Sequence, residues 1–357
     1  MLTGQFQNIK IAGLSVAVPT EKVSVDSYAS IFGTENIEKF KEMTGVQSVS
    51  RAKPNQTASD LGYEAAVDVF EKSDVSKKDI GFLIFVSQKP DYRMPSTAFV
   101  LHKRLGLPEN CLCFDLNLAC SGFIFGLQTI LSLLDNSESK AALLVTGDTS
   151  VKTLSPHDRT MVMLFGDSGS ATLLKKTDNC SPIRLGFRTD GNRFKSIITP
   201  AGAYRNRNQP HERVAWSDGI LRSDYDTHMK GMDVFGFSIT DVPQLMKDFM
   251  SWRETTADDY DYFVLHQANN YILKQLSRKL KIPTEKIPVS LDRFGNNSSN
   301  SIPLVLADHF GDKHQGQLHI FICGFGAGLS FACGDLSIET DVINPLLETD
   351  SFYLDSY

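Results

Sequence analysis

The stretch Asp79-Ile-Gly-Phe-Leu-Ile-Phe-Val86 decides the fold class of this chain. It is apolar with almost no polar residue between its ends, which predicts a strand buried on both faces of a sheet. A helix with apolar periodicity follows from Phe99 to Leu105, and after Leu107-Pro108 comes a second strand that ends at Asp115. Apolar strands that alternate with helices indicate an α/β fold whose sheets are covered on both faces.

The same order of elements recurs in the second half of the chain. Tyr260-Asp-Tyr-Phe-Val-Leu265 predicts a strand, a helix follows from about Asn270 to Leu280, and after Ile282-Pro283 an extended stretch ends at Asp292. Each half also closes with a similar pair of segments, which are residues 141–147 and 165–171 in the first half and 318–324 and 326–330 in the second.

We therefore predict two pseudo-repeated halves, residues 1–178 and 179–340, followed by a tail of residues 341–357. Chance similarity between two βαβ units remains an alternative, because such units are common. If the halves do repeat, ligand sites are expected where they meet. The tail interleaves acidic and aromatic residues, which suggests a surface strap or a mobile end.

Composition and charge exclude several classes of function. The chain has 357 residues, of which 41% are hydrophobic, and a formal charge of −6. This charge argues against binding nucleic acid or anionic membrane through the overall field. Residues Met1 to Thr20 lack the pattern of a secretory signal, and no apolar run approaches the roughly 20 residues that span a bilayer. We expect a cytoplasmic protein.

The six cysteines indicate neither a disulfide framework nor a metal site. No pair has the CxxC spacing of zinc or redox motifs. Cys111 and Cys113 alternate in an apolar stretch and are interpreted as strand residues.

Cys120 stands out by its position in Asp115-Leu-Asn-Leu-Ala-Cys120-Ser-Gly-Phe-Ile-Phe-Gly126. A strand ends there, and a strongly apolar helix is predicted from about Ser121 to Leu134. Unpaired N–H groups and the positive end of the helix dipole would lower the pKa of a thiol at this point, as a nucleophile requires. On spacing alone, a buried and inert cysteine is the more common alternative.

Two polar residues in the second half are candidates for the same pocket. His266 directly follows an apolar strand and precedes a helix, at the sheet edge where α/β sites lie. Asn296 lies in a polar loop that occupies the place of the Cys120 turn in the other half. A hydrogen-bonded structural histidine and an ordinary turn with asparagine capping are the alternatives. The pseudo-symmetry predicts that Cys120, His266 and Asn296 share one pocket.

Together these motifs resemble a known family. ACSGF around Cys120, HQAN at His266 and GNNSSNSIP at Asn296 look like the Cys-His-Asn signature of the thiolase superfamily, most closely β-ketoacyl-acyl-carrier-protein synthase III. The resemblance extends to about Thr340 and implies a thiolase-like layered αβαβα fold. Supporting matches are residues 165–170, 231–237 and 324–330.

The resemblance implies a decarboxylative Claisen condensation by an acyltransferase. Cys120 would take the acyl group of an acyl-CoA or acyl-acyl-carrier-protein thioester, with the backbone N–H groups of Cys120 and Ala327 as the oxyanion hole. Malonyl-acyl-carrier protein would lose CO₂, while neutral His266 and the Asn296 amide stabilise the enolate. The acyl-enzyme would then yield a 3-oxoacyl-acyl-carrier protein. The reaction needs no metal and no cofactor.

The resemblance also assigns substrate-binding positions. Family members clamp the adenine of CoA between a Trp and an Arg, and the Arg corresponds to Arg159. The Trp aligns near Lys39 and a second CoA-contacting Arg with Met43, so a CoA donor is not assured. Tyr271 replaces a basic residue at the mouth of the pantetheine tunnel. Met94 aligns with a dimer-contact residue that limits acyl length, which implies a homodimer.

The predicted helix after HQAN presents a basic face. Lys274, Arg278 and Lys279 lie opposite its apolar side, and the resemblance implies docking of an acidic acyl-carrier protein there. A merely solvated basic face is the alternative. Two alternatives to condensation also stay open. One is acyl transfer from Cys120 to a hydroxyl or amine with His266 as general base, and the other is a catalytically silent partner subunit.

Overall fold

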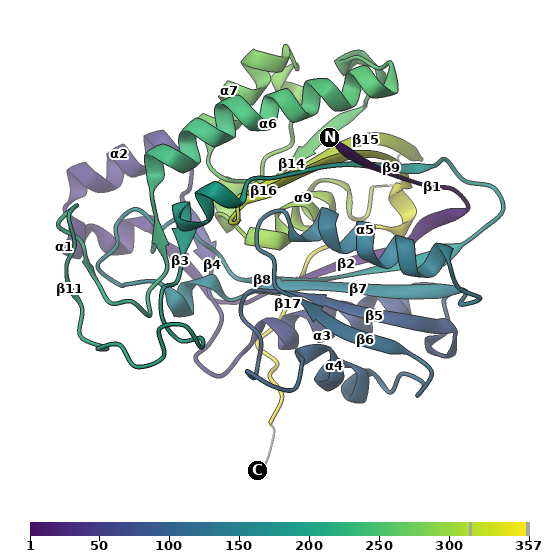
Figure 1. The fold of residues 1–357 in the computed structure, drawn as a ribbon, viewed down its shortest axis with the longest axis horizontal. Coiled ribbons are helices and arrows are strands. Elements are labelled where there is room, and N and C mark those ends of the chain that lie inside the picture. The colour runs from purple at the N-terminus through teal and green to yellow at the C-terminus, as the bar shows by residue number, and fades with distance from the viewer. Residues whose placement is uncertain (314–315, 355–357) are drawn as a thin grey trace.

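The computed structural model describes residues 1–313 and 316–354, and two sheets form its framework (Figure 1). The six-stranded sheet has the order β17 (Leu347–Glu348), β2 (Ile9–Val18), β8 (Ser168–Lys176), β7 (Ala141–Asp148), β5 (Ile80–Val86) and β6 (Leu112–Leu116). The five-stranded sheet has the order β1 (Leu2–Phe6), β9 (Ile183–Thr189), β16 (Ser330–Glu339), β15 (Gln317–Gly326) and β14 (Tyr262–Leu265).

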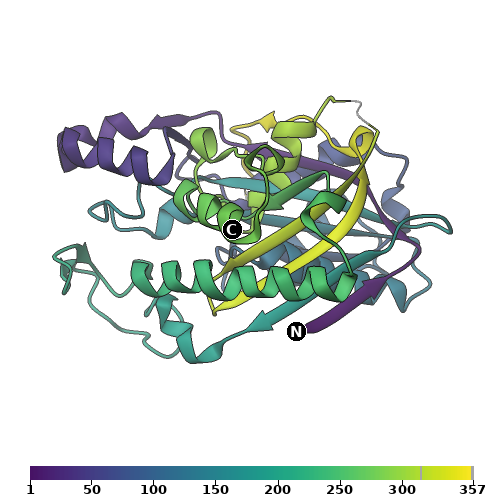
Figure 2. The ribbon, with the colours of Figure 1, turned by 90° about the horizontal axis from the view of Figure 1, so that it is seen from above.

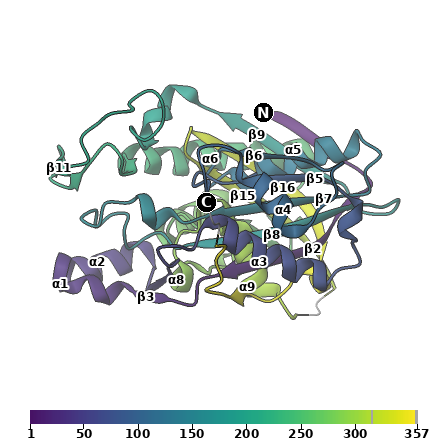
Figure 3. The ribbon, with the colours of Figure 1, turned by 90° about the horizontal axis from the view of Figure 1, so that it is seen from below.

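Helices form the other three layers, as Figures 1, 2 and 3 show from three sides. The middle layer is α5 (Gly122–Asp135) and α9 (Ser301–Phe310), and the outer layers are α3 (Ala58–Glu71) with α4 (Thr97–Leu105) and α6 (Gly231–Arg253) with α7 (Asn270–Leu280). Because α5 packs between two sheets, it is apolar nearly all round. The layered αβαβα fold predicted from the sequence is confirmed.

The apolar runs mark the observed strands well. β5 pairs in parallel with both β6 and β7, so it lies inside its sheet, and side chains of the two flanking helix layers cover it. This position explains why almost every residue from Ile80 to Val86 is apolar. The helix expected from about Asn270 to Leu280 has those bounds in the structure, and the Asn269 side chain accepts a hydrogen bond from Ile272 N–H at 2.8 Å.

Each sheet takes one strand from the far end of the chain. β1 pairs antiparallel with β9 and so lies in the sheet that the second half provides. β17 pairs in parallel with β2 and so lies in the sheet of the first half. The division into halves at residue 178 stays a prediction, but the sheets themselves are interlaced.

The internal repeat breaks before Asp292. The sequence predicted an extended stretch that ends at Asp292. Its residues 287–290 do not form a strand of either sheet, so the five-stranded sheet ends on β14. The Gln267 side chain contacts the backbone of this stretch instead. Its Nε2 donates to Pro288 O at 3.4 Å, and its Oε1 accepts from Ser290 N–H at 3.2 Å. A side-chain clamp therefore holds the segment that corresponds to β6 of the first half.

The tail is a surface strap as far as residue 354, and residues 355–357 lie outside the described residues. Gln56 Nε2 donates to Thr349 O at 3.1 Å and to Ser351 O at 3.0 Å. Tyr353 N–H donates to Asp60 Oδ1 at 2.9 Å. These bonds and β17 fasten the tail to the first sheet and to α3, so the strap, rather than a mobile end, is what the structure has there.

Candidate active site

Cys120 lies at the start of α5 and lines a small cavity of about 50 Å³. The end of β15 reaches it because two residues there lack side chains. A Cβ at Gly326 would lie 2.7 Å from Cys120 Cβ and 3.1 Å from its Sγ, and one at Gly324 would lie 3.0 Å from Cys120 O. Glycine at these two positions lets strand backbone of the second half pack against the candidate nucleophile.

Ser298 joins the three residues predicted to share a pocket. It lines the cavity beside Cys120, and its carbonyl accepts from Ser301 Oγ at 3.1 Å, a hydroxyl that lies 3.0 Å from His266 Nδ1. Its N–H donates to Asn296 Oδ1 at 2.9 Å. Ser298 therefore links the surroundings of the three residues, but of the three only Cys120 lines the cavity found among the described residues, and the shared pocket stays a prediction.

Sequence reasoning missed Ser298. It has a φ of +50°, which non-glycine residues seldom adopt and which often marks a functional site. Its location within GNNSSNSIP was the available signal, but nothing in the letters of that motif distinguishes this serine from its neighbour Ser299.

Asn296 is oriented by its surroundings. Its N–H donates to Leu164 O at 2.8 Å, and its carbonyl accepts from Gly166 N–H at 3.1 Å. The side-chain Oδ1 accepts the Ser298 N–H, so the amide oxygen is occupied and the NH₂ group faces away from it. Asn296 can therefore act as a fixed hydrogen-bond donor.

His266 is buried and neutral. It directly follows β14, and its N–H donates to Cys323 O at 2.7 Å. Burial lowers the pKa of the imidazole to about 3. Its Nδ1 lies 3.0 Å from Ser301 Oγ, and the edge of the Phe325 ring faces it at a centroid distance of 5.3 Å. Nδ1 is thereby occupied within the protein, which leaves Nε2 for a ligand.

The expected low pKa of Cys120 is not what the site produces. Burial raises the pKa of this thiol to about 12, and the negative charge of Asp148 adds to the increase. Asp148 is itself buried and accepts hydrogen bonds from Ser87 Oγ at 3.2 Å and Gln88 N–H at 3.1 Å. Desolvation is the largest influence on this thiol, which is therefore protonated in the free protein.

Cys120 and Ala327, the residues predicted to form the oxyanion hole, both line the cavity. In the part of the chain that the structure describes, neither backbone N–H makes a hydrogen bond to another residue. The Ala327 carbonyl accepts from Ser330 Oγ at 2.8 Å, and Ser330 Oγ also contacts Ser121 Oγ at 2.7 Å. This serine pair links the turn after β15 to the start of α5.

The predicted binding residues lie outside the cavity that surrounds Cys120. Arg159 is exposed, and Met94 is 83% exposed on the loop before α4. Tyr271 is half exposed at the start of α7, where its ring packs 5.7 Å from that of Phe235.

The predicted docking residues Lys274, Arg278 and Lys279 are all exposed on α7. Lys279 Nζ donates to Ile239 O at 2.5 Å, so this side chain also joins α7 to α6.

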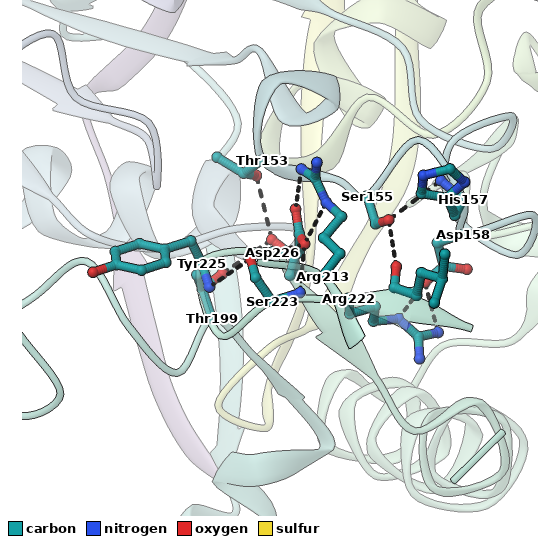
Figure 4. Close-up of polar contacts among 12 residues, drawn as sticks. Thr153, Ser155, His157, Asp158, Thr199, Arg213, Arg222, Ser223, Tyr225 and Asp226 are labelled. Carbon is teal, nitrogen blue, oxygen red and sulfur yellow. Dashed lines mark hydrogen bonds and ion pairs between the residues drawn. The ribbon is translucent and has the colours of Figure 1, made fainter. Parts of the chain in front are cut away.

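A polar network joins the segment of residues 199–228 to residues 153–158, as Figure 4 shows. The Arg222 guanidinium is buried and pairs with Asp158 Oδ2 at 2.6 Å, while Arg213 makes two hydrogen bonds to Asp226 at 2.8 and 2.9 Å. Thr153, which lines the cavity, lies 3.3 Å from the hydroxyl of Thr227 on this segment. The segment therefore contributes directly to the cavity wall.

Comparison with known proteins agrees with this geometry. The family model described as 3-Oxoacyl-[acyl-carrier-protein (ACP)] synthase III matches residues 114–191, and its C-terminal model matches residues 250–338. The beta-ketoacyl-[acyl-carrier-protein] synthase III of Streptococcus gordonii is 31% identical over 90% of this chain and 97% of its own length. The chain belongs to this family. The resemblance drawn from the sequence is confirmed, and the chain is a condensing enzyme.

Solved structures of the family have the same fold. A 3-oxoacyl-(acyl-carrier protein) synthase from Burkholderia xenovorans superimposes with a TM-score of 0.92 at 32% identity, covering 98% of this chain and 99% of that one. The synthase III of Thermus thermophilus superimposes with a TM-score of 0.79 at 26% identity, covering 92% of this chain and 99% of that one. In the described part of this synthase III-family chain, no three metal-ligating side chains cluster, and no helix has the length and apolar character to cross a membrane.

Proposed function

We propose that this synthase III-family protein condenses an acyl thioester with malonyl-acyl-carrier protein through an acyl-Cys120 intermediate. In the first half-reaction the Cys120 sulfur bonds to the thioester carbonyl, and the carrier thiol leaves with the proton. The backbone N–H groups of Cys120 and Ala327 support this step, because among the described residues neither has a hydrogen-bond partner and both can therefore bind the oxyanion.

The second half-reaction uses the other two residues. The malonyl group loses CO₂, and its thioester oxygen becomes an enolate. His266 is neutral at physiological pH, and its Nε2 can donate to that oxygen in the tautomer in which Nδ1 accepts the Ser301 hydroxyl proton. The Asn296 NH₂ group can donate as well, because Ser298 N–H occupies the oxygen of that amide and not its nitrogen. The carbanion attacks the Cys120 thioester to give the 3-oxoacyl product and the free thiol.

The observation that carries the proposal is the orientation of the Asn296 amide beside a neutral His266. Simple acyl transfer to a hydroxyl or amine has less need of an enolate-binding amide. Catalytic silence is disfavoured because all three side chains are present around Ser298.

Intact-mass spectrometry tests both half-reactions. The wild type is incubated with a panel of acyl-CoA and acyl-acyl-carrier-protein thioesters and then with malonyl-acyl-carrier protein, beside Cys120→Ala and Asn296→Ala. We expect an adduct on the wild type and on Asn296→Ala, none on Cys120→Ala, and a roughly 10²- to 10³-fold slower condensation by Asn296→Ala. No adduct from any donor would contradict the mechanism. Equal condensation by Asn296→Ala would contradict the role given to the Asn296 amide, and an adduct on the wild type with no condensation product would favour acyl transfer.

We also propose a homodimer. β6 forms an open edge of its sheet, and large apolar side chains are exposed near it. Met94 is 83% exposed, Phe99 54% and Leu112 53%. A second copy that pairs along β6 would cover this row and satisfy the strand edge. Light scattering at micromolar concentration tests this, and a monomer would refute it.

The remaining proposals concern location and partner. We expect a cytoplasmic enzyme whose acidic acyl-carrier protein docks on Lys274, Arg278 and Lys279. Charge reversal at Lys274 and Arg278 should raise the KM for malonyl-acyl-carrier protein and leave acylation by a CoA donor unchanged. An unchanged KM would mean that the basic face is only solvated.

A further inference from the structure

Lys89 stands in the cavity wall beside Cys120. It follows the end of β5, is partly buried, and lies among residues that are apolar or carry only neutral polar groups. Among the described residues that line this cavity, it is the only one with a charge. Its charge is close enough to act on the Cys120 thiol, whose pKa it lowers against the larger effect of burial.

The ammonium group of Lys89 has no protein partner. Within residues 1–313 and 316–354 no hydrogen bond or ion pair to its Nζ is found, and only its backbone N–H is engaged, with Ser87 Oγ at 2.9 Å. The neighbouring carboxylate of Asp148 does not serve as a partner. Its oxygens accept from Ser87, Gln88 and Ser299, and it lies beyond ion-pair distance of Lys89.

Because Lys89 is partly buried in the cavity wall and its ammonium has no partner among the described residues, it can bind an anionic group that enters the cavity. The cavity is where the acyl group attached to Cys120 must lie, so the anion is expected on the substrate. When the acyl group of a thioester is acidic, its acidic group is a carboxylate. An ammonium binds a carboxylate with a charge-assisted hydrogen bond.

We propose that Lys89 binds a carboxylate of the substrate, and that the acyl donor of this enzyme is a short dicarboxylic monothioester. The inference rests on the proposed function. The malonyl group also carries a free carboxylate, but a cation that holds that group stabilises the charge that decarboxylation removes and so opposes the reaction. We therefore expect Lys89 to bind the carboxylate of the acyl donor, because that carboxylate is retained throughout the reaction.

The test compares donors that differ in the terminal group alone. Acylation of Cys120 is followed by intact mass with succinyl-CoA and with its neutral monomethyl ester, on the wild type, Lys89→Met and Lys89→Arg. We expect the wild type to prefer succinyl-CoA by roughly tenfold to a hundredfold, the typical range for a charge-assisted hydrogen bond. Lys89→Met should lose that preference while it still accepts the ester, and Lys89→Arg should keep part of it.

A second arm distinguishes the source of the carboxylate. After acylation with a neutral donor, the KM for malonyl-acyl-carrier protein is compared between wild type and Lys89→Met. A raised KM in the variant, together with no donor preference in the wild type, would overturn the dicarboxylic donor and assign Lys89 to malonyl. If neither arm responds to Lys89→Met, the proposal is overturned altogether. If no donor acylates the wild type, the proposed function itself fails, and this inference fails with it.

Discussion

The protonation state of Cys120 gives the most direct test of the site. Burial and the Asp148 charge raise the pKa of the thiol to about 12, from an ordinary value near 9. Three pH units correspond to about 4 kcal/mol against the thiolate. At neutral pH roughly one molecule in 10⁵ would carry the thiolate, so alkylation should be roughly a thousandfold slower than for an ordinary cysteine.

The assay is alkylation by iodoacetamide between about pH 6 and pH 9, with the modified fraction measured on the peptide that contains Cys120. The rate should rise tenfold for each pH unit, without a plateau, because the fraction of thiolate does so well below the pKa. Limited access of the reagent would lower the whole curve but would not change its slope. Asp148→Asn removes the nearby negative charge and should shift the curve toward faster alkylation.

A plateau near pH 7 would refute this reasoning. It would mean that the start of α5 stabilises the thiolate more than burial opposes it, as the sequence alone had suggested. Cys120→Ala, labelled in parallel, reports the reaction of the other five cysteines.

Three further predictions follow from other parts of the molecule. Ser301→Ala removes the partner of His266 Nδ1 and should slow condensation roughly tenfold, with the acylation rate unchanged; equal slowing of both half-reactions would contradict a role through His266. Burial raises the pKa of Asp167 to about 6, so ionisation opposes folding, and the stability due to its protonated form is lost as pH rises through that value. Asp167→Asn should therefore be more stable than the wild type, and urea unfolding should show that this difference is about 2–3 kcal/mol larger at pH 8 than at about pH 4. A difference that does not change with pH would exclude the ionisation of Asp167 as its cause. Arg222→Leu leaves the buried Asp158 carboxylate unpaired and should cost about 3–5 kcal/mol in thermal or urea unfolding, part of which Arg222→Leu with Asp158→Leu should restore.

The sequence predicted those features that follow from local pattern. Apolar runs such as Ile80–Val86 occur because the strand is covered on both faces, and the layered fold follows from their alternation with helices. Cys120 and His266 were candidates because each stands shortly after a strand, and Asn296 because it lies in a polar turn of the other half. Their assignment as a catalytic set rested on the resemblance of ACSGF, HQAN and GNNSSNSIP to the family motifs, because position alone left structural roles open.

Features that depend on distant contacts were not predictable. The helix start at Cys120 is visible in the sequence, but the burial that raises the pKa of its thiol comes from surrounding residues of both halves. Ser298 stands out by its backbone conformation, with a positive φ, and the residue type alone does not predict that conformation. The break in the repeat depends on the Gln267 side chain, which binds backbone more than twenty residues away.

The exchange of end strands between the two sheets has a consequence for how the chain is made. β1 is synthesised well before its partner β9, which begins only at Ile183. β2 is likewise synthesised long before its parallel neighbour β17, which begins at Leu347. A fragment that stops between the halves would leave both open strand edges exposed. The nascent protein must therefore keep these edges from pairing wrongly until synthesis is complete, and cutting the gene at the centre of the repeat should yield two pieces that aggregate unless they are produced together.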